Sequence, residues 1–167
     1  MVEFGGLPGT GKSTLARVLA ERVGAVLVRV DEVEAAMRRC GLAVGTGIAA
    51  YGVAHAVAGP HLRRGFVVVV DAVNPVVEAR EGWRGLAAEC GAGHVVVETV
   101  CGEEVHRGRV EGRVNDIPDW VYPDWDGVVV RRGEYEPRGD ERLVVDTGRA
   151  VEVCHEEVAR YVEAALG

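Results

Sequence analysis

The chain has 167 residues, nearly half of them hydrophobic, which suits one compact domain over residues 1–167 with a core covered on both sides. Its 19 Lys and Arg against 26 Asp and Glu give a formal net charge of −7, which argues against a binder of duplex nucleic acid. Local arginine clusters still allow a short basic groove. The sequence has no apolar run of membrane-spanning length, and its four cysteines lack metal-site spacing, so we expect a cytoplasmic protein without membrane association.

The first elements along the chain surround a glycine-rich octapeptide. A short strand is expected at Val2–Phe4, and Gly6–Ser13 then reads Gly-Leu-Pro-Gly-Thr-Gly-Lys-Ser, which fits G-x-x-x-x-G-K-[ST] at every position. Apolar residues at helical spacing follow over Thr14–Val23. Strand, loop and helix form the setting of a phosphate-binding loop, and this context favours that interpretation over a chance glycine-rich turn.

Each residue type in this octapeptide suits phosphate binding. Glycines such as Gly9 and Gly11 let the backbone curl around Thr10, so that successive N–H groups point at the phosphates. Lys12 is expected to reach the β and γ oxygens, and the Ser13 hydroxyl to ligate Mg²⁺. The sequence therefore predicts a site for a nucleotide and Mg²⁺ near the N-terminus.

The rest of the chain alternates between buried-strand and helix signals. Continuous β-branched runs, typical of strands covered on both faces, occur at 25–30, 66–70, 94–100 and 143–145. Helical stretches are expected at 31–39, 47–64, 76–89 and 103–113, with a last helix after residue 148. This alternation predicts an α/β fold in three layers, with a mainly parallel sheet between helices.

Residues 115–139 differ from this pattern because they hold several prolines and no regular period. Long irregular segments in compact domains are usually functional, so we expect a lid or loop region over about 107–139. Trp120 and Trp125 lie within it and are candidates for stacking on a substrate ring. The alternative is that both tryptophans pack beneath the loop.

Two aspartates end buried runs, and ligands gather at the carboxyl ends of strands in open α/β sheets. Asp71 closes Phe-Val-Val-Val-Val-Asp and is expected to bind Mg²⁺ together with Ser13. Asp31 closes Val-Leu-Val-Arg-Val-Asp and is a candidate catalytic base that accepts the proton of a substrate hydroxyl. Because a helix is expected after each, helix capping is the alternative role for both.

Asn74 and Arg80 follow Asp71 closely, at the end of the sheet where ligands are expected. Asn74 is a candidate for hydrogen bonding to the substrate, and Arg80 offers a two-pronged donor to an anionic group. The alternatives are that Asn74 starts the next helix and that Arg80 is a solvated surface residue.

Three arginines occupy the predicted helix at 103–113. Arg109 and Arg113 share one face at spacing i, i+4, whereas Arg107 does not. A cation from this face would stabilise charge that moves between the β- and γ-phosphates, so Arg109 and Arg113 are candidate catalytic residues. The alternative is a helix surface salt-bridged to neighbouring glutamates.

Several segments together resemble the small P-loop kinases often described as AAA-type ATP-binding proteins. The matching segments are the loop with Ser-Thr-Leu-Ala after its lysine, Arg-Val-Asp-Glu-Val at 29–33, Val-Val-Asp-Ala-Val-Asn-Pro at 69–75, Arg-Gly-Arg-Val-Glu-Gly-Arg at 107–113, and Glu-Tyr-Glu-Pro with Val-Asp-Thr late in the chain. This group is similar to polynucleotide 5′-hydroxyl kinase, chloramphenicol phosphotransferase, gluconate kinase and adenylylsulfate kinase. Relatives often carry Trp after Glu-Tyr-Glu-Pro, where this chain has Arg138.

The resemblance implies a nucleoside-monophosphate-kinase-like fold with sheet order 2-3-1-4-5. It also implies these roles: Gly9, Gly11, Lys12, Ser13 and Thr14 bind ATP and Mg²⁺, Asp31 is the base, and Asp71 and Asn74 lie at the metal and acceptor site. The activity that follows is transfer of the γ-phosphate of Mg-ATP to a hydroxyl of a small molecule. Two alternatives stay open, namely a nucleic-acid 5′-hydroxyl as the acceptor and a nucleotide-dependent switch or ATPase without an acceptor.

Overall fold

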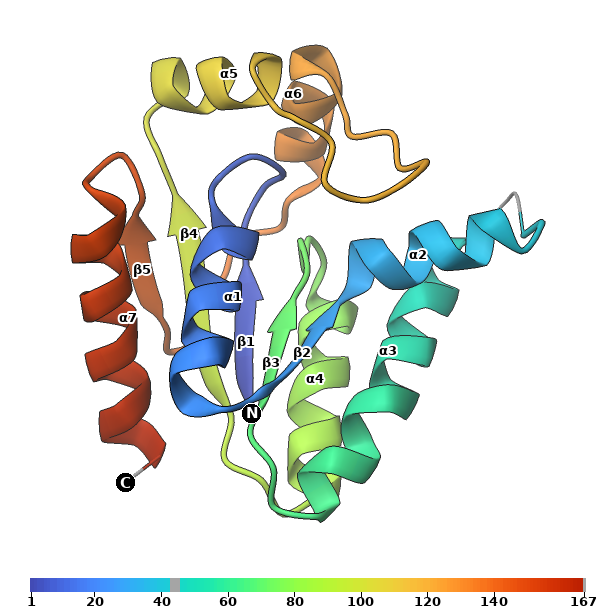
Figure 1. Cartoon of the computed structure of the whole chain (residues 1–167), viewed down its shortest axis with the longest axis vertical. Coiled ribbons are helices and arrows are strands. Elements are labelled where there is room, and N and C mark those ends of the chain that lie inside the picture. The colour runs from blue at the N-terminus through green and yellow to red at the C-terminus, as the bar shows by residue number, and fades with distance from the viewer. Residues whose placement is uncertain (43–45, 167) are drawn as a thin grey trace.

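The computed structural model describes residues 1–42 and 46–166, and within them the chain forms a sheet with helices on both faces (Figure 1). The sheet has five strands in the order β2-β3-β1-β4-β5, and every neighbouring pair is parallel. The predicted α/β class and strand order are therefore confirmed. None of the helices in the described ranges is long and apolar enough to cross a membrane.

Elements of the two types alternate along most of the chain. The strands are β1 (Val2–Gly5), β2 (Val26–Arg29), β3 (Val68–Asp71), β4 (Val95–Val100) and β5 (Leu143–Asp146). The helices are α1 (Lys12–Val23), α2 (Val30–Arg39), α3 (Thr46–Arg63), α4 (Val77–Glu89), α5 (Glu103–Glu111), α6 (Trp125–Glu134) and α7 (Val151–Leu166). Most predicted elements exist within a few residues of their expected bounds.

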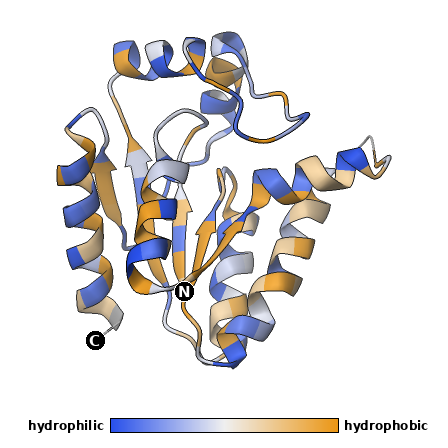
Figure 2. Ribbon diagram, viewed as in Figure 1, coloured by the Kyte–Doolittle hydropathy of each residue, from blue (hydrophilic) through white to orange (hydrophobic). Residues whose placement is uncertain are grey.

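The buried valines of the strands separate two apolar layers, as the orange strands of Figure 2 illustrate. One layer packs α1 and α7 on the sheet around Phe4, Leu19 and Val158. The other packs α3 and α4 around Ala54, Trp83 and residues of β2 and β3. Because both faces are covered, the strands carry continuous apolar runs rather than an alternating pattern.

Helix α6 corrects the prediction that residues 115–139 lack regular structure. It begins after Asp124, whose side chain caps the helix by accepting a hydrogen bond from the Gly127 amide at 2.9 Å. Three successive valines and two glycines are poor helix formers, and among the helix residues only Val128 is buried. The helix therefore carries no apolar stripe that periodicity could reveal.

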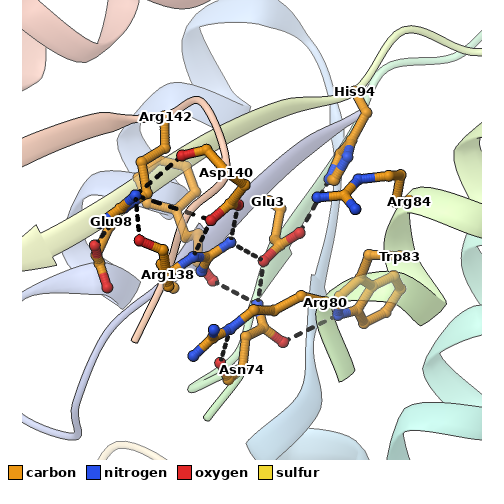
Figure 3. Close-up of polar contacts among 12 residues, drawn as sticks. Glu3, Asn74, Arg80, Trp83, Arg84, His94, Glu98, Arg138, Asp140 and Arg142 are labelled. Atoms are coloured by element: carbon orange, nitrogen blue, oxygen red, sulfur yellow. Dashed lines mark hydrogen bonds and ion pairs between the residues drawn. The ribbon is translucent and has the colours of Figure 1, made fainter. Parts of the chain in front are cut away.

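A buried polar cluster joins the sheet to the segment that returns from α6 to β5 (Figure 3). Its centre is Glu3 of the middle strand, which is fully buried. One Glu3 oxygen accepts hydrogen bonds from Asn74 at 2.9 Å and Arg138 at 3.3 Å, and the other contacts His94 at 3.0 Å. Arg138 also binds Asp140, whose pKa it lowers to about 2.

We expect Arg138→Met to lower the free energy of unfolding by about 3–5 kcal/mol, because it removes the arginine that pairs with the buried Glu3 carboxylate and takes the nearest cation from Asp140. Urea unfolding at pH 7 measures this loss. The matched control is Arg84→Met, which removes an exposed pair with Glu81 and should cost less than about 1 kcal/mol. Equal losses in the two variants would contradict a central role for Arg138.

Candidate functional site

A cavity of about 770 Å³ opens at the carboxyl ends of the strands. The phosphate-binding loop, the start of α2 and the end of β3 form its inner wall, and residues between α5 and α6 form its outer wall. The charged groups predicted from separate parts of the sequence meet here: Lys12, Asp31, Asp71, Arg109 and Arg113 all line the cavity.

The loop between β1 and α1 has the backbone that a phosphate cradle needs. Gly9 has φ 89°, and a Cβ there would lie 2.7 Å from a methyl group of Val110 and close to His106. Only glycine meets both demands. The Lys12 ammonium is buried and donates to the Leu7 carbonyl at 2.9 Å, so its charge is held at the loop. Burial lowers its pKa, while Asp71 and Asp31 oppose that shift.

Thr10 has a different part from its neighbours in the loop. Its hydroxyl is buried, donates to the Leu7 carbonyl at 2.8 Å and pairs with Thr99 at 2.7 Å. The Thr10 carbonyl accepts a hydrogen bond from Thr147 at 2.8 Å. The side chain of Thr10 therefore fixes the loop to β4, whereas Gly9, Gly11, Ser13 and Thr14 line the cavity.

Asp31 lies in the first turn of α2 and faces the cavity. The cap position belongs to Arg29, and no described side chain caps this helix, so the capping alternative for Asp31 is wrong. The same alternative fails for Asp71, because the following helix α4 is capped at Val76. Burial raises the pKa of Asp31, Lys12 opposes the rise, and Asp71 adds to it.

Asp71 ends β3 and is almost fully buried. In the parallel register it sits beside Arg29 of β2, whose Nε lies 3.3 Å from the Asp71 carboxylate. Sequence reasoning assigned no role to Arg29, although a charged residue inside the apolar run Val26–Val30 was the available signal. A buried cation paired with a carboxylate at a strand end is a feature of candidate functional sites.

Asn74 and Arg80 do not line the cavity, which corrects their prediction as substrate-binding residues. The side-chain amide of Asn74 donates a hydrogen bond to Glu3 and accepts one from the Trp83 indole at 3.1 Å. Arg80 donates to the carbonyls of Asn74, Pro75, Glu136 and Pro137, so it is neither free nor solvated. Asn74 does not start α4 either.

The two arginines of the α5 region have different surroundings. Arg109 donates to the hydroxyl of Thr147 at 2.8 Å and to its carbonyl at 2.7 Å, so one end of the cavity wall is fixed. Arg113 lies over the ring of Tyr122, 4.1 Å from its centre. Arg113 makes no salt bridge to the α5 glutamates among the described residues, whereas Arg107 pairs with Glu111.

The two tryptophans separate into one cavity residue and one packing residue. Trp120 lines the cavity, with the Arg38 guanidinium 4.8 Å from its ring centre. Trp125 lies outside the cavity lining and meets His106 edge to face at 5.4 Å. The prediction that Trp125 contacts the substrate is therefore wrong, and this residue packs at the start of α6.

The oxygens that line this cavity fit the ligand chemistry of Mg²⁺. Among residues 1–42 and 46–166, no group of three His, Cys, Asp or Glu side chains is arranged to hold a metal. Mg²⁺ instead takes one or two protein oxygens and completes its shell with phosphates and water. Ser13 and Asp71 offer such oxygens in the wall of the same cavity.

Comparison with known proteins places this geometry in context. A family model described as "AAA domain" matches residues 1–120. Over 41 residues the chain is 56% identical to "Uncharacterized protein Rv2004c" of Mycobacterium tuberculosis, a match that spans 25% of this chain and only 8% of that relative.

Two solved structures share the fold over nearly the whole chain. A gluconokinase from Sinorhizobium meliloti 1021 has a TM-score of 0.71 at 20% identity, covering 98% of this chain and 92% of its own. The Mycobacterium tuberculosis APS kinase CysC, in complex with AMPPNP and APS, has a TM-score of 0.62 at 19% identity, covering 97% and 96%. The chain therefore has the fold of small P-loop kinases.

We expect Asp31→Asn to raise the melting temperature at pH 7. The pKa of Asp31 is raised in the folded state, so the charged form opposes folding above that pKa. Each kcal/mol of relief corresponds to about 2–4 °C in a chain of this size. The gain should vanish in acid below the ordinary carboxyl pKa, where Asp31 is protonated whether folded or unfolded. Thermal unfolding across pH measures it, and an Asn variant that melts lower at pH 7 contradicts it.

Proposed function

The chain belongs to the AAA domain family, and from this premise we propose that it is a phosphotransferase that moves the γ-phosphate of Mg-ATP to a hydroxyl of a small molecule. One observation carries the proposal: a phosphate-binding loop and the carboxylates Asp31 and Asp71 line one cavity together. A gluconokinase and an APS kinase with a bound ATP analogue share the fold, which supports this class of reaction.

In the proposed reaction the acceptor hydroxyl attacks the γ-phosphorus in line and the bond to the β-phosphate oxygen breaks, leaving ADP. Asp31 takes the hydroxyl proton, for which its raised pKa and its position in the cavity wall suit it. Lys12 neutralises charge on the phosphates. Ser13 and Asp71 would hold Mg²⁺, which supplies further charge neutralisation when bound.

The shape of the cavity suggests how water is excluded. We define the lid segment as residues 112–124, between α5 and α6; in Figure 1 it leans from α5 and α6 toward α2. Arg113, Trp120 and Tyr122 from this segment line the cavity opposite the phosphate-binding loop. A lid that closes over the acceptor limits wasteful hydrolysis of ATP.

The direct test is transfer of γ-labelled phosphate from Mg-ATP to pooled polyols, sugars and other hydroxylated metabolites. We expect a labelled product with the wild type and a rate reduced by about 10²–10⁴-fold in Asp31→Asn. Lys12→Ala should lose about 10²–10³-fold. Glu78→Gln, an exposed substitution on α4 outside the cavity lining, is the control and should match the wild type. Full transfer by Asp31→Asn would remove it as the base.

The same assay separates the two rival functions. Labelled 5′-hydroxyl oligonucleotides, with a rate that falls steeply as salt rises, would indicate a nucleic-acid kinase. The net charge of −7 speaks against that outcome. ATP hydrolysis at an unchanged rate with and without every acceptor pool would indicate a switch or ATPase instead.

We expect kcat/KM for transfer to fall as the pH drops, because the base works only when ionised. Since burial raises the pKa of Asp31, this loss should begin at a higher pH than an exposed aspartate would give. A pH–rate profile at saturating Mg-ATP measures it. A flat acid limb down to the ordinary aspartate pKa would contradict the assignment of Asp31.

A further inference from the structure

Arg29 is a buried cation of the cavity wall, with a side chain only 5% exposed. It ends β2 and contacts carboxylates on two different parts of the chain. Asp71 lies beside it on β3, and Asp116 lies 87 positions away in the lid segment. A third carboxylate, Glu32, is 3.5 Å away but mostly exposed.

The hydrogen-bond geometry distinguishes these partners. Both terminal nitrogens of Arg29 donate to Asp116, at 2.7 and 3.3 Å, in a two-pronged arrangement. One of them also donates to the Tyr122 hydroxyl at 2.8 Å. The Nε, which faces Asp71, makes no hydrogen bond to any residue that the structure describes. The directional bonds of Arg29 therefore go to the lid segment, and Asp71 receives only its charge.

The two lid residues that contact Arg29 also contact each other. Tyr122 donates to Asp116 at 2.6 Å, so the two lid residues form a closed triangle with Arg29. Arg29 holds the pKa of Asp116 well below its usual range, and the phenol pKa of Tyr122 is raised by burial and by Asp116. Around neutral pH the triangle therefore keeps one cation, one anion and one neutral hydroxyl.

We propose that Arg29 is a positioning residue that docks the lid segment against the phosphate-binding cavity through Asp116 and Tyr122. This inference rests on the proposed phosphotransfer, for which it supplies the closure. When the lid segment lifts, Arg29 loses its hydrogen-bonded counter-ion and keeps only the Asp71 carboxylate and the exposed Glu32. An arginine fork fits this task better than lysine, because it reaches two oxygens of Asp116 and the phenol together.

Proteolysis tests docking without any turnover. Trypsin can cut after Arg113, whose guanidinium lies over the Tyr122 ring. We expect Arg29→Met and Asp116→Asn to speed cleavage between residues 113 and 114 by at least about tenfold, since either change breaks the two-pronged bond between Asp116 and a guanidinium group that is only 5% exposed. Tyr122→Phe should give a smaller increase. Arg29→Lys should lie between Arg29→Met and the wild type.

Arg17→Met is the matched control, because Arg17 also pairs with Asp116, at 3.4 Å, but both groups of that pair are well exposed. It should leave cleavage within about twofold of the wild type. Circular dichroism checks that each variant is folded. If Arg29→Met does not fold, the cleavage rates of Asp116→Asn and Tyr122→Phe, which change the lid residues of the same contact, test the proposal. Wild-type cleavage in folded Asp116→Asn overturns the proposal.

A second measurement links docking to chemistry. In the Arg29 and Asp116 variants, ATP hydrolysis should rise relative to phosphate transfer, because an undocked lid admits water. Transfer that proceeds with unchanged cleavage and an unchanged hydrolysis ratio overturns the role of Arg29 and leaves the phosphotransferase intact. Faster cleavage in a protein that labels no acceptor keeps the docking role and overturns the phosphotransferase.

Discussion

A carboxylate buried in the middle strand constrains the architecture around the site. Glu3 is enclosed between the sheet and α4, where an unpaired charge would cost several kcal/mol. Its partners Asn74, His94 and Arg138 come from three separate connections of the chain. Each connection must therefore adopt one position. Asn74 follows the strand that ends in Asp71, and Arg138 follows the helix that carries the far end of the lid segment.

This constraint explains why predicted substrate residues became structural ones. Asn74 has φ 52°, a left-handed conformation that asparagine tolerates better than most residues, and it points its amide at Glu3 rather than into the cavity. Arg80 then satisfies the carbonyls of the turn around Asn74. Both residues are near cavity residues in the sequence, but their side chains stabilise the turn that follows Asp71 instead of lining the cavity.

The sequence predicted those features that depend on local rules. The octapeptide predicted the phosphate-binding loop, and continuous valine runs predicted a parallel sheet, because both patterns are read within a few residues. Contacts between distant residues were invisible, as Arg29 and Asp116 show. Helix α6 was missed because its stability depends on the Asp124 cap and on one buried valine rather than on periodicity. Arg138 departs from the residue that relatives often carry, and its hydrogen bond to Glu3 accounts for its place in this chain. The two residues are far apart in the sequence, so no local rule could predict this contact.

The α6 end and the middle of the lid segment have different anchors. At the α6 end, the chain beyond the helix is tied to the sheet by Arg138, with its side chain 1% exposed and paired with two buried or nearly buried carboxylates. The middle of the lid segment has Arg29 as its enclosed anchor, and its other contacts with α1 and α2 involve exposed arginines. A segment fixed at its base, and held at its middle by Arg29 and by the buried side chain of Ile117, can lift without unfolding the sheet. The two buried arginines therefore differ in their partners, because Arg138 pairs with Glu3 of the middle strand and with Asp140, whereas Arg29 pairs with Asp71 of the cavity wall and with Asp116 of the lid segment.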